Sequence, residues 1–258
     1  MVSVSPRKCS GCKNGAAFPY ALRTAFQPIY DLNDGSVFAY EALVRGEQGQ
    51  GAPDVLALVD DENLYAFDQA CRVTAIRQAV AAGLLDGEAR LSINFMPNAV
   101  YSPMACIQLT LKTAREVGLA EDRLIFELTE NERVDTAHVS EIVAAYRALG
   151  FATAIDDFGA GYAGLNLLAN LQTDLVKLDM ELVRGIDRSE PRRQIVYAIV
   201  RLCEQMGRQI IAEGIETKAE LDVLQAMGIN LVQGYYLARP ALGRLAPPLS
   251  LQPRRLAV

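Results

Sequence analysis

The sequence predicts an α/β fold, a TIM-like (β/α)8 barrel with an antiparallel first strand, and three observations lead to this prediction. Short apolar or β-branched runs alternate with longer helical patterns, which is typical of parallel strands joined by right-handed crossovers. Asn33-Asp34-Gly35 separates the first two runs and signals a hairpin, so the first strand should run against the others. The length of 258 residues is ordinary for a single barrel of this kind.

The expected elements follow one another in that alternating order. We expect strands near residues 25–31, 37–43, 90–95, 123–128, 152–156, 174–178, 209–212 and 230–233, and helices near 54–60, 64–82, 103–117, 137–149, 164–169, 191–206 and 217–227. Gly150 and Gly207 follow helical runs, as C-terminal caps often do. We therefore divide the chain into an N-terminal extension (1–21), one domain (22–241) and a proline-rich, weakly ordered C-terminal tail (242–258).

Composition excludes several classes of function. The formal net charge is −6, which argues against a broad basic surface for a nucleic-acid polymer. No apolar run approaches the roughly 20 residues that a membrane helix needs, and the N-terminus has no signal-peptide core. The five cysteines do not resemble a disulfide framework, and Cys9 and Cys12 most simply form a turn, because a zinc site needs two more ligands. We expect a cytoplasmic protein without membrane insertion.

Polar side chains stand where the apolar runs end. In chain order they are Glu41, Asn94, Glu127, Glu130, Asp156, Asp157, Lys177, Asp179, Glu213, Glu216 and Gln233. A single polar residue after a strand means little, because loops are polar. Here seven consecutive strands end in this way, and in a β/α barrel those ends meet at the face where active sites are built. The pattern therefore predicts a functional site at this rim.

The chemistry of the predicted rim points to metal ions. Six of its side chains carry oxygen donors (Glu41, Asn94, Glu127, Asp156, Asp157 and Glu213), and that much negative charge needs cations. Oxygen-only ligands favour Mg²⁺, Mn²⁺ or Ca²⁺ over zinc, and six ligands suit two ions better than one. Lys177 could hold an attacking water or stabilise phosphate charge. The one histidine, His138, lies in a helical stretch, so histidine chemistry is not expected.

The motifs resemble those of the EAL-domain cyclic di-GMP phosphodiesterases. Residues 40–45 read Tyr-Glu-Ala-Leu-Val-Arg, close to the motif from which that family takes its name. The resemblance continues in family order through Gln27-Pro28, Asn94, Glu127-Leu-Thr-Glu130, Asp156-Asp157-Phe-Gly, Lys177-Leu-Asp179, Glu213-Gly-Ile-Glu216 and Gln233-Gly-Tyr, and it covers about residues 22–240.

The resemblance implies a function and a role for each of these residues. It implies hydrolysis of cyclic di-GMP to linear pGpG by two-metal activation of water, with Mg²⁺ or Mn²⁺ as two ions per site, Ca²⁺ as an inhibitor, and a homodimer. One ion would be held by Glu41, Asn94, Glu127 and Asp156, and the other by Asp156, Asp157 and Glu213. Lys177, Glu41, Glu213 and Glu130 would be catalytic, with Lys177 at the catalytic water and Glu130 anchoring the loop after Asp157. Substrate would contact Gln27, Leu43, Arg45 and Asp179, with Glu216 and Gln233 as supporting residues.

Two departures from the family pattern leave the implied metal ligands in place. Asn94 is followed by Phe95-Met96-Pro97, where many members have a serine before the proline, so a hydroxyl is missing. Ala163 and Gly164 replace serines that are common after the Gly-Tyr step. These changes concern the hydrogen bonds of the loops and not the carboxylates.

Simpler explanations exist for single residues. Asp157-Phe158-Gly159 also spells a kinase metal motif, but the glycine-rich loop and the other kinase motifs are missing. Asp179 could be only a helix N-cap, and Gln233 only part of a turn. For the whole chain, the alternatives are a non-catalytic cyclic di-GMP receptor and a protein-interaction barrel. Receptors of this family typically lose metal ligands, and none is lost here, which favours the enzyme.

Overall fold

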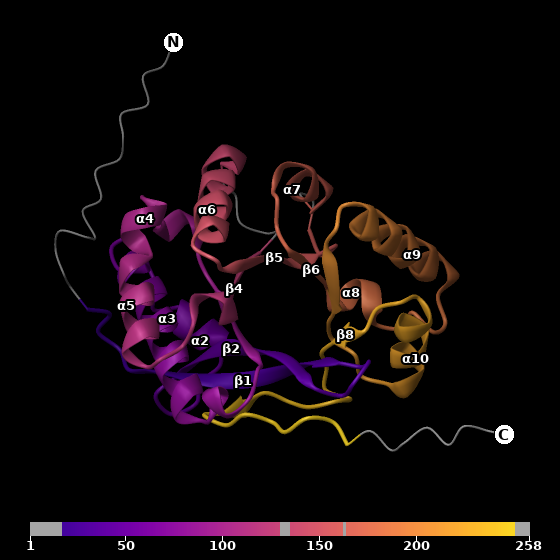
Figure 1. Cartoon of the computed structure of the whole chain (residues 1–258), viewed down its shortest axis with the longest axis horizontal. Coiled ribbons are helices and arrows are strands. Elements are labelled where there is room, and N and C mark those ends of the chain that lie inside the picture. Colours follow the sequence, from indigo (N-terminus) through magenta and orange to yellow (C-terminus); the bar gives the residue numbers. More distant parts are fainter. Residues whose placement is uncertain (1–16, 130–134, 162–163, 251–258) are drawn as a thin grey trace, which may run out of the picture.

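The computed structural model describes residues 17–129, 135–161 and 164–250, and it shows a closed eight-stranded barrel surrounded by helices (Figure 1). The strands are β1 (Leu22–Asp31), β2 (Val37–Gly46), β3 (Arg90–Asn94), β4 (Leu124–Thr129), β5 (Ala152–Phe158), β6 (Leu175–Leu178), β7 (Gln209–Ala212), β8 (Leu231–Val232) and the short β9 (Ala241–Leu242). Strands β2 to β8 pair in parallel with their neighbours, and β1 closes the barrel by pairing antiparallel with β2 and β8. The predicted fold class is confirmed.

Helices fill the layer outside the strands. In the described residues they are α2 (Ala52–Leu56), α3 (Leu64–Ala81), α4 (Pro103–Cys106), α5 (Gln108–Glu116), α6 (Thr136–Ala148), α7 (Gly164–Asn170), α8 (Met180–Val183), α9 (Glu190–Gln205) and α10 (Lys218–Ala226), with 3₁₀ turns at Leu84–Asp86, Pro97–Ala99 and Glu121–Arg123. The predicted helix at 103–117 is divided into α4 and α5, and α8 was not predicted. Helix α10 starts at a capping box in which Thr217 and Glu220 satisfy each other's backbone N–H groups.

The C-terminal segment covers the hairpin of β1 and β2. Strand β9 pairs with β1, the Tyr40 hydroxyl donates to the carbonyl oxygen of Ala246 (2.5 Å), and the Tyr30 hydroxyl donates to that of Pro247 (3.2 Å). The weakly ordered tail from residue 242 onward stays a prediction, and the described residues up to 250 make these contacts with the hairpin. A proline donates no backbone hydrogen bond, but its carbonyl oxygen still accepts one, as that of Pro247 does from Tyr30.

Two separate cores pack against the strands. The larger core lies between strands and helices and includes Phe126, Tyr146 and Leu178. The smaller one lies inside the barrel and consists of Ile29, Ala39, Ile125, Ala154, Leu175, Ile211 and Leu231, one residue from each strand except β3 and β9. We call these seven residues the apolar layer. They fill the barrel at the level from which the site residues are placed.

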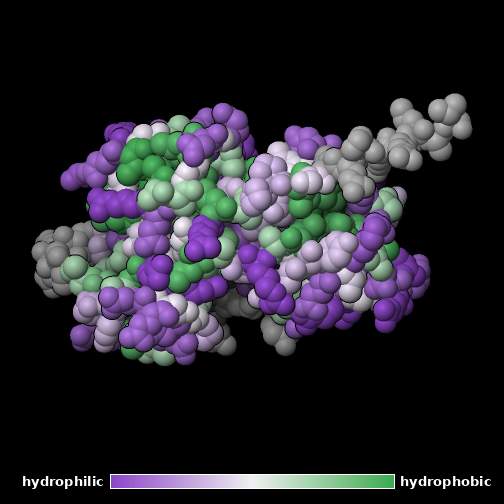
Figure 2. Space-filling view, turned by 90° about the horizontal axis from the view of Figure 1, so that it is seen from below, coloured by the Kyte–Doolittle hydropathy of each residue, from purple (hydrophilic) through white to green (hydrophobic). Residues whose placement is uncertain are grey.

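The surface carries both hydrophobic and hydrophilic side chains. Seen from below (Figure 2), hydrophobic side chains gather in separate areas on the two halves of this face, with hydrophilic side chains around them. Apolar atoms make up much of any protein surface, so these areas alone do not identify a binding face. Within the described residues, no helix combines the length and apolar character required to cross a membrane.

Candidate metal centre

A ring of polar side chains lies two residues beyond the apolar layer. A step of two residues along a strand leads from one layer to the other: from Ile125 to Glu127 on β4, from Ala154 to Asp156 on β5, and from Leu175 to Lys177 on β6. The step also leads to Glu41, Glu213 and Gln233, and on the antiparallel β1 it runs backward, from Ile29 to Gln27. Residues two apart in a strand share a face. All seven side chains therefore belong to the inside of the barrel, and we call them, with Asn94 and Asp157, the charged layer.

Lys177 lies at the centre of four carboxylates. Its Nζ is 2.7 Å from Glu213 Oε1, 2.8 Å from Asp156 Oδ1 and 2.9 Å from Glu127 Oε2. The Glu41 carboxylate is 3.6 Å away. Burial opposes the charge on Lys177, but the surrounding carboxylates, Asp156 first among them, raise its pKa well above the ordinary lysine value. The amine therefore remains an ammonium ion at neutral pH and acts as a hydrogen-bond donor.

Glu127 is the most deeply buried carboxylate of the charged layer. It has no exposed surface, and its Oε1 accepts a hydrogen bond from the Ser92 hydroxyl at 2.5 Å. Burial raises the pKa of Glu127 to about 8; Lys177 opposes this shift, whereas Glu41 adds to it. Burial likewise raises the pKa of Glu213 well above its ordinary value, against the effect of Lys177. In the metal-free fold both carboxylates therefore hold a proton more strongly than an exposed glutamate does.

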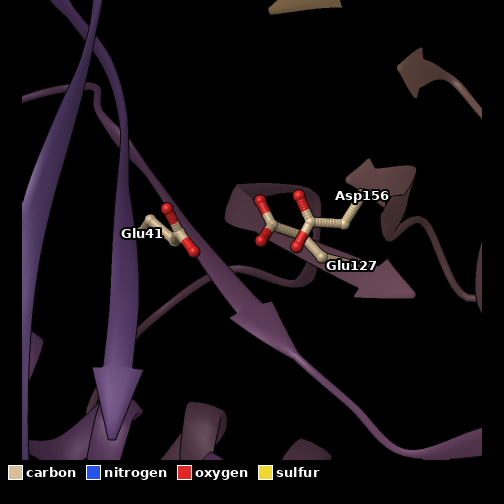
Figure 3. A group of neighbouring side chains, drawn as sticks. All are labelled: Glu41, Glu127 and Asp156. Atoms are coloured by element: carbon tan, nitrogen blue, oxygen red, sulfur yellow. The ribbon is translucent and has the colours of Figure 1, made fainter. Parts of the chain in front are cut away.

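Glu41 is held from two sides. Gln233 Nε2 donates to its Oε2 at 2.7 Å, and Asn94 Nδ2 donates to its Oε1 at 3.3 Å. Figure 3 shows the Glu41 carboxylate, on β2, facing those of Glu127 and Asp156 across the interior. Gln233 thus contacts Glu41 directly, and its supporting role at the site stays a prediction.

An irregularity in β5 allows the two adjacent aspartates to reach the same site. A regular strand sends neighbouring side chains to opposite faces. The pairing of β5 with β6 shifts register between Ile155 and Phe158, and Asp157 has a left-handed backbone (φ 53°), which is rare for residues other than glycine. Burial, followed by the charge of Asp156, raises the pKa of Asp157 to about 6. Such strained backbone is found preferentially at functional sites.

The charged layer fits divalent cations. Carboxylate oxygens of Glu41, Glu127 and Asp156 lie within 4.8 Å of one another, and so do those of Asp156, Asp157 and Glu213. Asp156 belongs to both groups, so it could bridge two ions. The donors are all oxygens, the set that hard cations prefer. The two groups together contain five carboxylates and Lys177 pairs with four of them, so bound cations would also relieve the excess negative charge.

Three of the predicted substrate residues, Gln27, Leu43 and Arg45, make different kinds of contact. Gln27 Nε2 donates to the carbonyl oxygen of Ala238 (3.2 Å), and Arg45 Nη1 to that of Val44 (2.7 Å). Leu43 is partly exposed and lines a cavity of about 320 Å³ that also touches Asn94. Leu43 thus lies beside the charged layer, whereas Gln27 and Arg45 are each held by a backbone carbonyl group.

Two other predicted site residues have a hydrogen-bond or ion-pair partner outside the charged layer. Asp179 caps α8 by accepting the Glu181 N–H at 2.7 Å, as the simpler explanation anticipated. Glu216 lies at the surface and pairs with Arg184 at 2.7 Å. Glu130 lies outside the described residues. Conversely, Ser92 was missed, although its place two residues before Asn94 in Leu-Ser-Ile-Asn is a signal for the same face of β3.

Comparisons with known proteins agree with this geometry. A family model described as "EAL domain" matches residues 20–240. Over 221 residues the chain is 31% identical to the "Blue light- and temperature-regulated antirepressor BluF" of Escherichia coli, covering 84% of this chain and 54% of BluF. It is 30% identical over 230 residues to the "Cyclic di-GMP phosphodiesterase NbdA" of Pseudomonas aeruginosa, covering 85% of this chain and 29% of NbdA. The chain thus spans about half of BluF and under a third of NbdA.

Solved structures show the same barrel. A standalone versatile EAL protein from Vibrio cholerae, in a c-di-GMP bound form, is 44% identical with a TM-score of 0.86, over 90% of this chain and 98% of that one. A manganese/cy-diGMP complex of Klebsiella pneumoniae BlrP1 is 35% identical with a TM-score of 0.81, over 88% of this chain and 58% of that one. Because the family model matches nearly the whole described barrel, the chain belongs to the EAL domain family.

Proposed function

We propose that this barrel is a metal-dependent phosphodiesterase that hydrolyses cyclic di-GMP to linear pGpG with two metal ions. One observation carries the proposal: two groups of carboxylates share Asp156 and lie directly around Lys177. Two ions about 3.5–4 Å apart are the common device for in-line displacement at a phosphodiester. The NbdA relative is named as a cyclic di-GMP phosphodiesterase, and the Vibrio and Klebsiella structures contain the dinucleotide.

The chain's own residues bind and orient the reactants. When bound, the ions would lower the pKa of a water molecule and neutralise phosphate charge. Glu41, Asn94, Glu127 and Asp156 would hold one ion, and Asp156, Asp157 and Glu213 the other. Lys177, kept protonated by its carboxylate neighbours, donates hydrogen bonds to the attacking water and does not remove its proton. Gln233 and Asn94 hold the Glu41 carboxylate in its orientation.

The reaction breaks one of the two phosphodiester bonds of the ring. The water oxygen bonds to phosphorus as its proton passes to a carboxylate of the charged layer, and the P–O3′ bond breaks. The released O3′ takes up a proton, which leaves a 5′-phosphate and a free 3′-hydroxyl, the ends of pGpG. Hydrogen bonds from a fixed ammonium group stabilise the charge that develops on the phosphate oxygens.

Substrate contacts are proposed for the open edge of the charged layer. Arg45 would turn from the Val44 carbonyl to a phosphate, and Leu43 and Gln27 would line the cleft. The cavity of about 320 Å³ beside Asn94 is lined by apolar side chains such as Leu43 and Phe67, a suitable environment for one base. Asp179 would contact a guanine edge, and the same carboxylate would also remain the N-cap of α8.

Mg²⁺ and Mn²⁺ are the proposed cofactors, with Ca²⁺ as an inhibitor. Mg²⁺ requires a compact octahedral geometry, whereas Ca²⁺ accepts more ligands at longer distances. Ca²⁺ should therefore bind the same carboxylates but place the water less well. BlrP1 has been solved with cy-diGMP and manganese and also with cy-diGMP and calcium, so both ions occur with the dinucleotide in that protein.

The alternative from a different class is a receptor that binds cyclic di-GMP without hydrolysing it. It has support from the relative BluF, which is named an antirepressor. The complete set of carboxylates around Lys177 favours the enzyme, because a receptor does not need to activate water. Both functions predict nucleotide binding, and only the enzyme predicts turnover.

A homodimer is also part of the proposal, on the strength of the family resemblance. Leu165 on α7 and Ile195 and Leu202 on α9 are exposed and line an apolar cavity of about 510 Å³, which makes this face the candidate for the interface. Sedimentation velocity of the wild type and of Leu165→Asp would test it, with a shift to monomer expected in the variant. A cytoplasmic location remains a prediction from the sequence.

The experiment that tests the function is a hydrolysis assay with separation of products. We expect pGpG from cyclic di-GMP with Mg²⁺ or Mn²⁺, and binding without efficient turnover with Ca²⁺. Glu41→Ala should abolish turnover but retain the fold, while Glu190→Ala, at an exposed carboxylate on α9, should behave as wild type. Nucleotide binding without any product at high enzyme concentration would favour the receptor, and the absence of binding would exclude both functions.

A further inference from the structure

A buried ion pair outside the barrel lies directly behind the charged layer. Arg72 and Asp68, one turn apart on α3, are 0% and 3% exposed, and Arg72 Nη2 is 2.6 Å from Asp68 Oδ2. Arg72 Nη1 also donates to the hydroxyl of Tyr146 on α6 at 3.0 Å. The function proposed above uses none of these three residues.

The pair contacts the outward neighbours of two charged-layer residues. The guanidinium carbon of Arg72 lies 5.6 Å from the ring centroid of Phe95 and 5.4 Å from that of Phe126. Phe95 directly follows Asn94, and Phe126 directly precedes Glu127. Side chains alternate along a strand, so each phenylalanine points into the helix layer while its neighbour points into the barrel. A guanidinium between two aromatic faces is a favourable cation–π arrangement.

The pair also holds the backbone after Asn94. Asp68 Oδ1 accepts the Met96 N–H at 3.0 Å, and the Phe95 N–H donates to the carbonyl oxygen of Glu127 at 3.0 Å. Glu127 lies within a strand that is paired on both sides, so its position does not depend on these two hydrogen bonds. Asn94, the last residue of β3, is paired with β4 but lies beyond the last residue of β3 that is paired with β2, so its position depends more on the contacts that follow it.

Stability alone does not account for this arrangement. Removing two charges from water is costly, and replacing a buried ion pair with apolar residues of similar size is often neutral or stabilising. Burial raises the pKa of Asp68 despite the nearby Arg72, which indicates that the site opposes the charge. A contribution to the geometry of a neighbouring site is an explanation that does not depend on net stability.

We propose that the Asp68–Arg72 pair is a positioning device for the metal centre, which fixes Asn94 from outside the barrel and thereby raises the affinity for metal. The inference rests on the proposed metal site but adds two residues to it that are ligands of neither ion. Asp68 also lines the cavity proposed for one base, and a Mn²⁺ titration without nucleotide measures its effect on the metal site alone. Partners of this indirect kind typically change metal affinity by about 10- to 100-fold.

The test is a Mn²⁺ titration by calorimetry on paired substitutions. Asp68→Leu with Arg72→Met removes both charges together and should leave a folded protein. We expect its Mn²⁺ affinity to fall about tenfold relative to wild type. In an Asn94→Ala background the same pair of substitutions should change the affinity by less than about twofold, because the positioned residue is already missing.

Two further variants keep the inference falsifiable. Arg72→Lys keeps the charge but loses the flat group between the two rings, so a smaller loss of affinity is expected; it carries the test if the paired variant does not fold. Val196→Ala, in the core under α9 on the far side of the barrel (Figure 1), should lower the unfolding temperature without changing Mn²⁺ affinity.

The outcomes separate this inference from the proposed function. Equal Mn²⁺ affinity in wild type and in the Arg72 variants would overturn the positioning role and leave the metal site intact. A loss of the same size with and without Asn94 would overturn it as well. If the wild type binds no Mn²⁺, the proposed metal site and the positioning role both fail.

Discussion

Two layers of side chains inside the same barrel, two residues apart along each strand, have opposite chemistry. The apolar layer consists of Ile29, Ala39, Ile125, Ala154, Leu175, Ile211 and Leu231, and it packs as a core. Two residues further along the strands, the charged layer places carboxylates around Lys177 at distances of 2.7–3.6 Å. The two layers belong to the same strands and face the same interior, so the opposite chemistry comes mainly from the side chains. The apolar layer is a hydrophobic core, whereas burial of the charged layer raises the pKa of Glu127 and Glu213 in the metal-free fold.

Replacing the central cation should have the largest effect on catalysis. Lys177→Met removes the donor at the attacking water, and we expect turnover to fall by about 100- to 1,000-fold, as for the loss of one preorganised donor. Mn²⁺ binding should persist, because no oxygen ligand is removed and a competing charge is lost. The measurements are steady-state hydrolysis and Mn²⁺ calorimetry. Lys112→Met, at an exposed lysine on α5, is the matched control, and equal turnover in the two variants would contradict the role of Lys177.

The apolar layer should respond in the opposite way. Ile125→Ala creates a cavity on β4 two residues before Glu127, and we expect a loss of about 2–5 kcal/mol in the free energy of unfolding. Turnover per folded molecule should stay close to wild type, since the carboxylates remain. Urea unfolding and a hydrolysis assay well below the transition measure the two effects. A large loss of turnover with little loss of stability would show that the layers are not separate in function.

The cost of the charged layer should depend on pH. In the metal-free fold the pKa of Glu127 is raised from 4.5 to about 8, so the folded protein keeps a proton that the unfolded chain releases. This contribution to stability is fully present below about pH 4.5 and is lost as the pH rises toward 8. Asp157, raised from 3.8 to about 6, changes stability in the same direction at lower pH.

Glu127→Gln isolates this effect. With EDTA present, the variant should gain stability relative to wild type between pH 5 and pH 8, on the order of a few kcal/mol. Urea unfolding at the two pH values gives the difference directly. A difference between the two proteins that is constant with pH would contradict the raised pKa.

The smallest effect is expected at Glu216, which shares a sequence motif with Glu213 but not its location. Glu216 pairs with Arg184 at the surface, with 48% of its side chain exposed. Glu216→Gln should cost at most about 1 kcal/mol of stability and leave turnover within about twofold of wild type. Glu213→Gln, measured beside it in the same hydrolysis assay, should lose most activity. Similar losses in both would mean that Glu216 moves into the site when substrate binds.

The sequence could predict the barrel and most of the charged layer because both depend on a simple period. Alternating apolar runs mark the strands, and the polar residue at each strand end marks the rim. Glu41, Glu127, Asp156, Lys177, Glu213 and Gln233 are all located in this way. Each lies two residues after an apolar-layer residue, so strand geometry alone brings them together.

The features that the sequence could not predict do not follow the two-residue alternation of the strands. Asp157 joins the site through a register shift and a left-handed backbone, which no alternation reveals. Asp68 and Arg72 have the spacing of an ordinary exposed helix pair, yet they are buried between α3, α6 and two strands. The contacts of the proline-rich segment up to residue 250 with β1 and β2 are long-range, so composition alone could not predict them.

The most direct test of the account is the number of Mn²⁺ ions bound by wild type and by Asp156→Asn. Asp156 belongs to both carboxylate groups, so calorimetric titration should give two ions per chain in the wild type and a severe loss of both in the variant. Asp222→Asn, at an exposed aspartate on α10, should bind as wild type does. Wild type that binds no Mn²⁺, or an Asp156→Asn variant that still binds two ions, would contradict the claim that the charged layer is a two-metal centre.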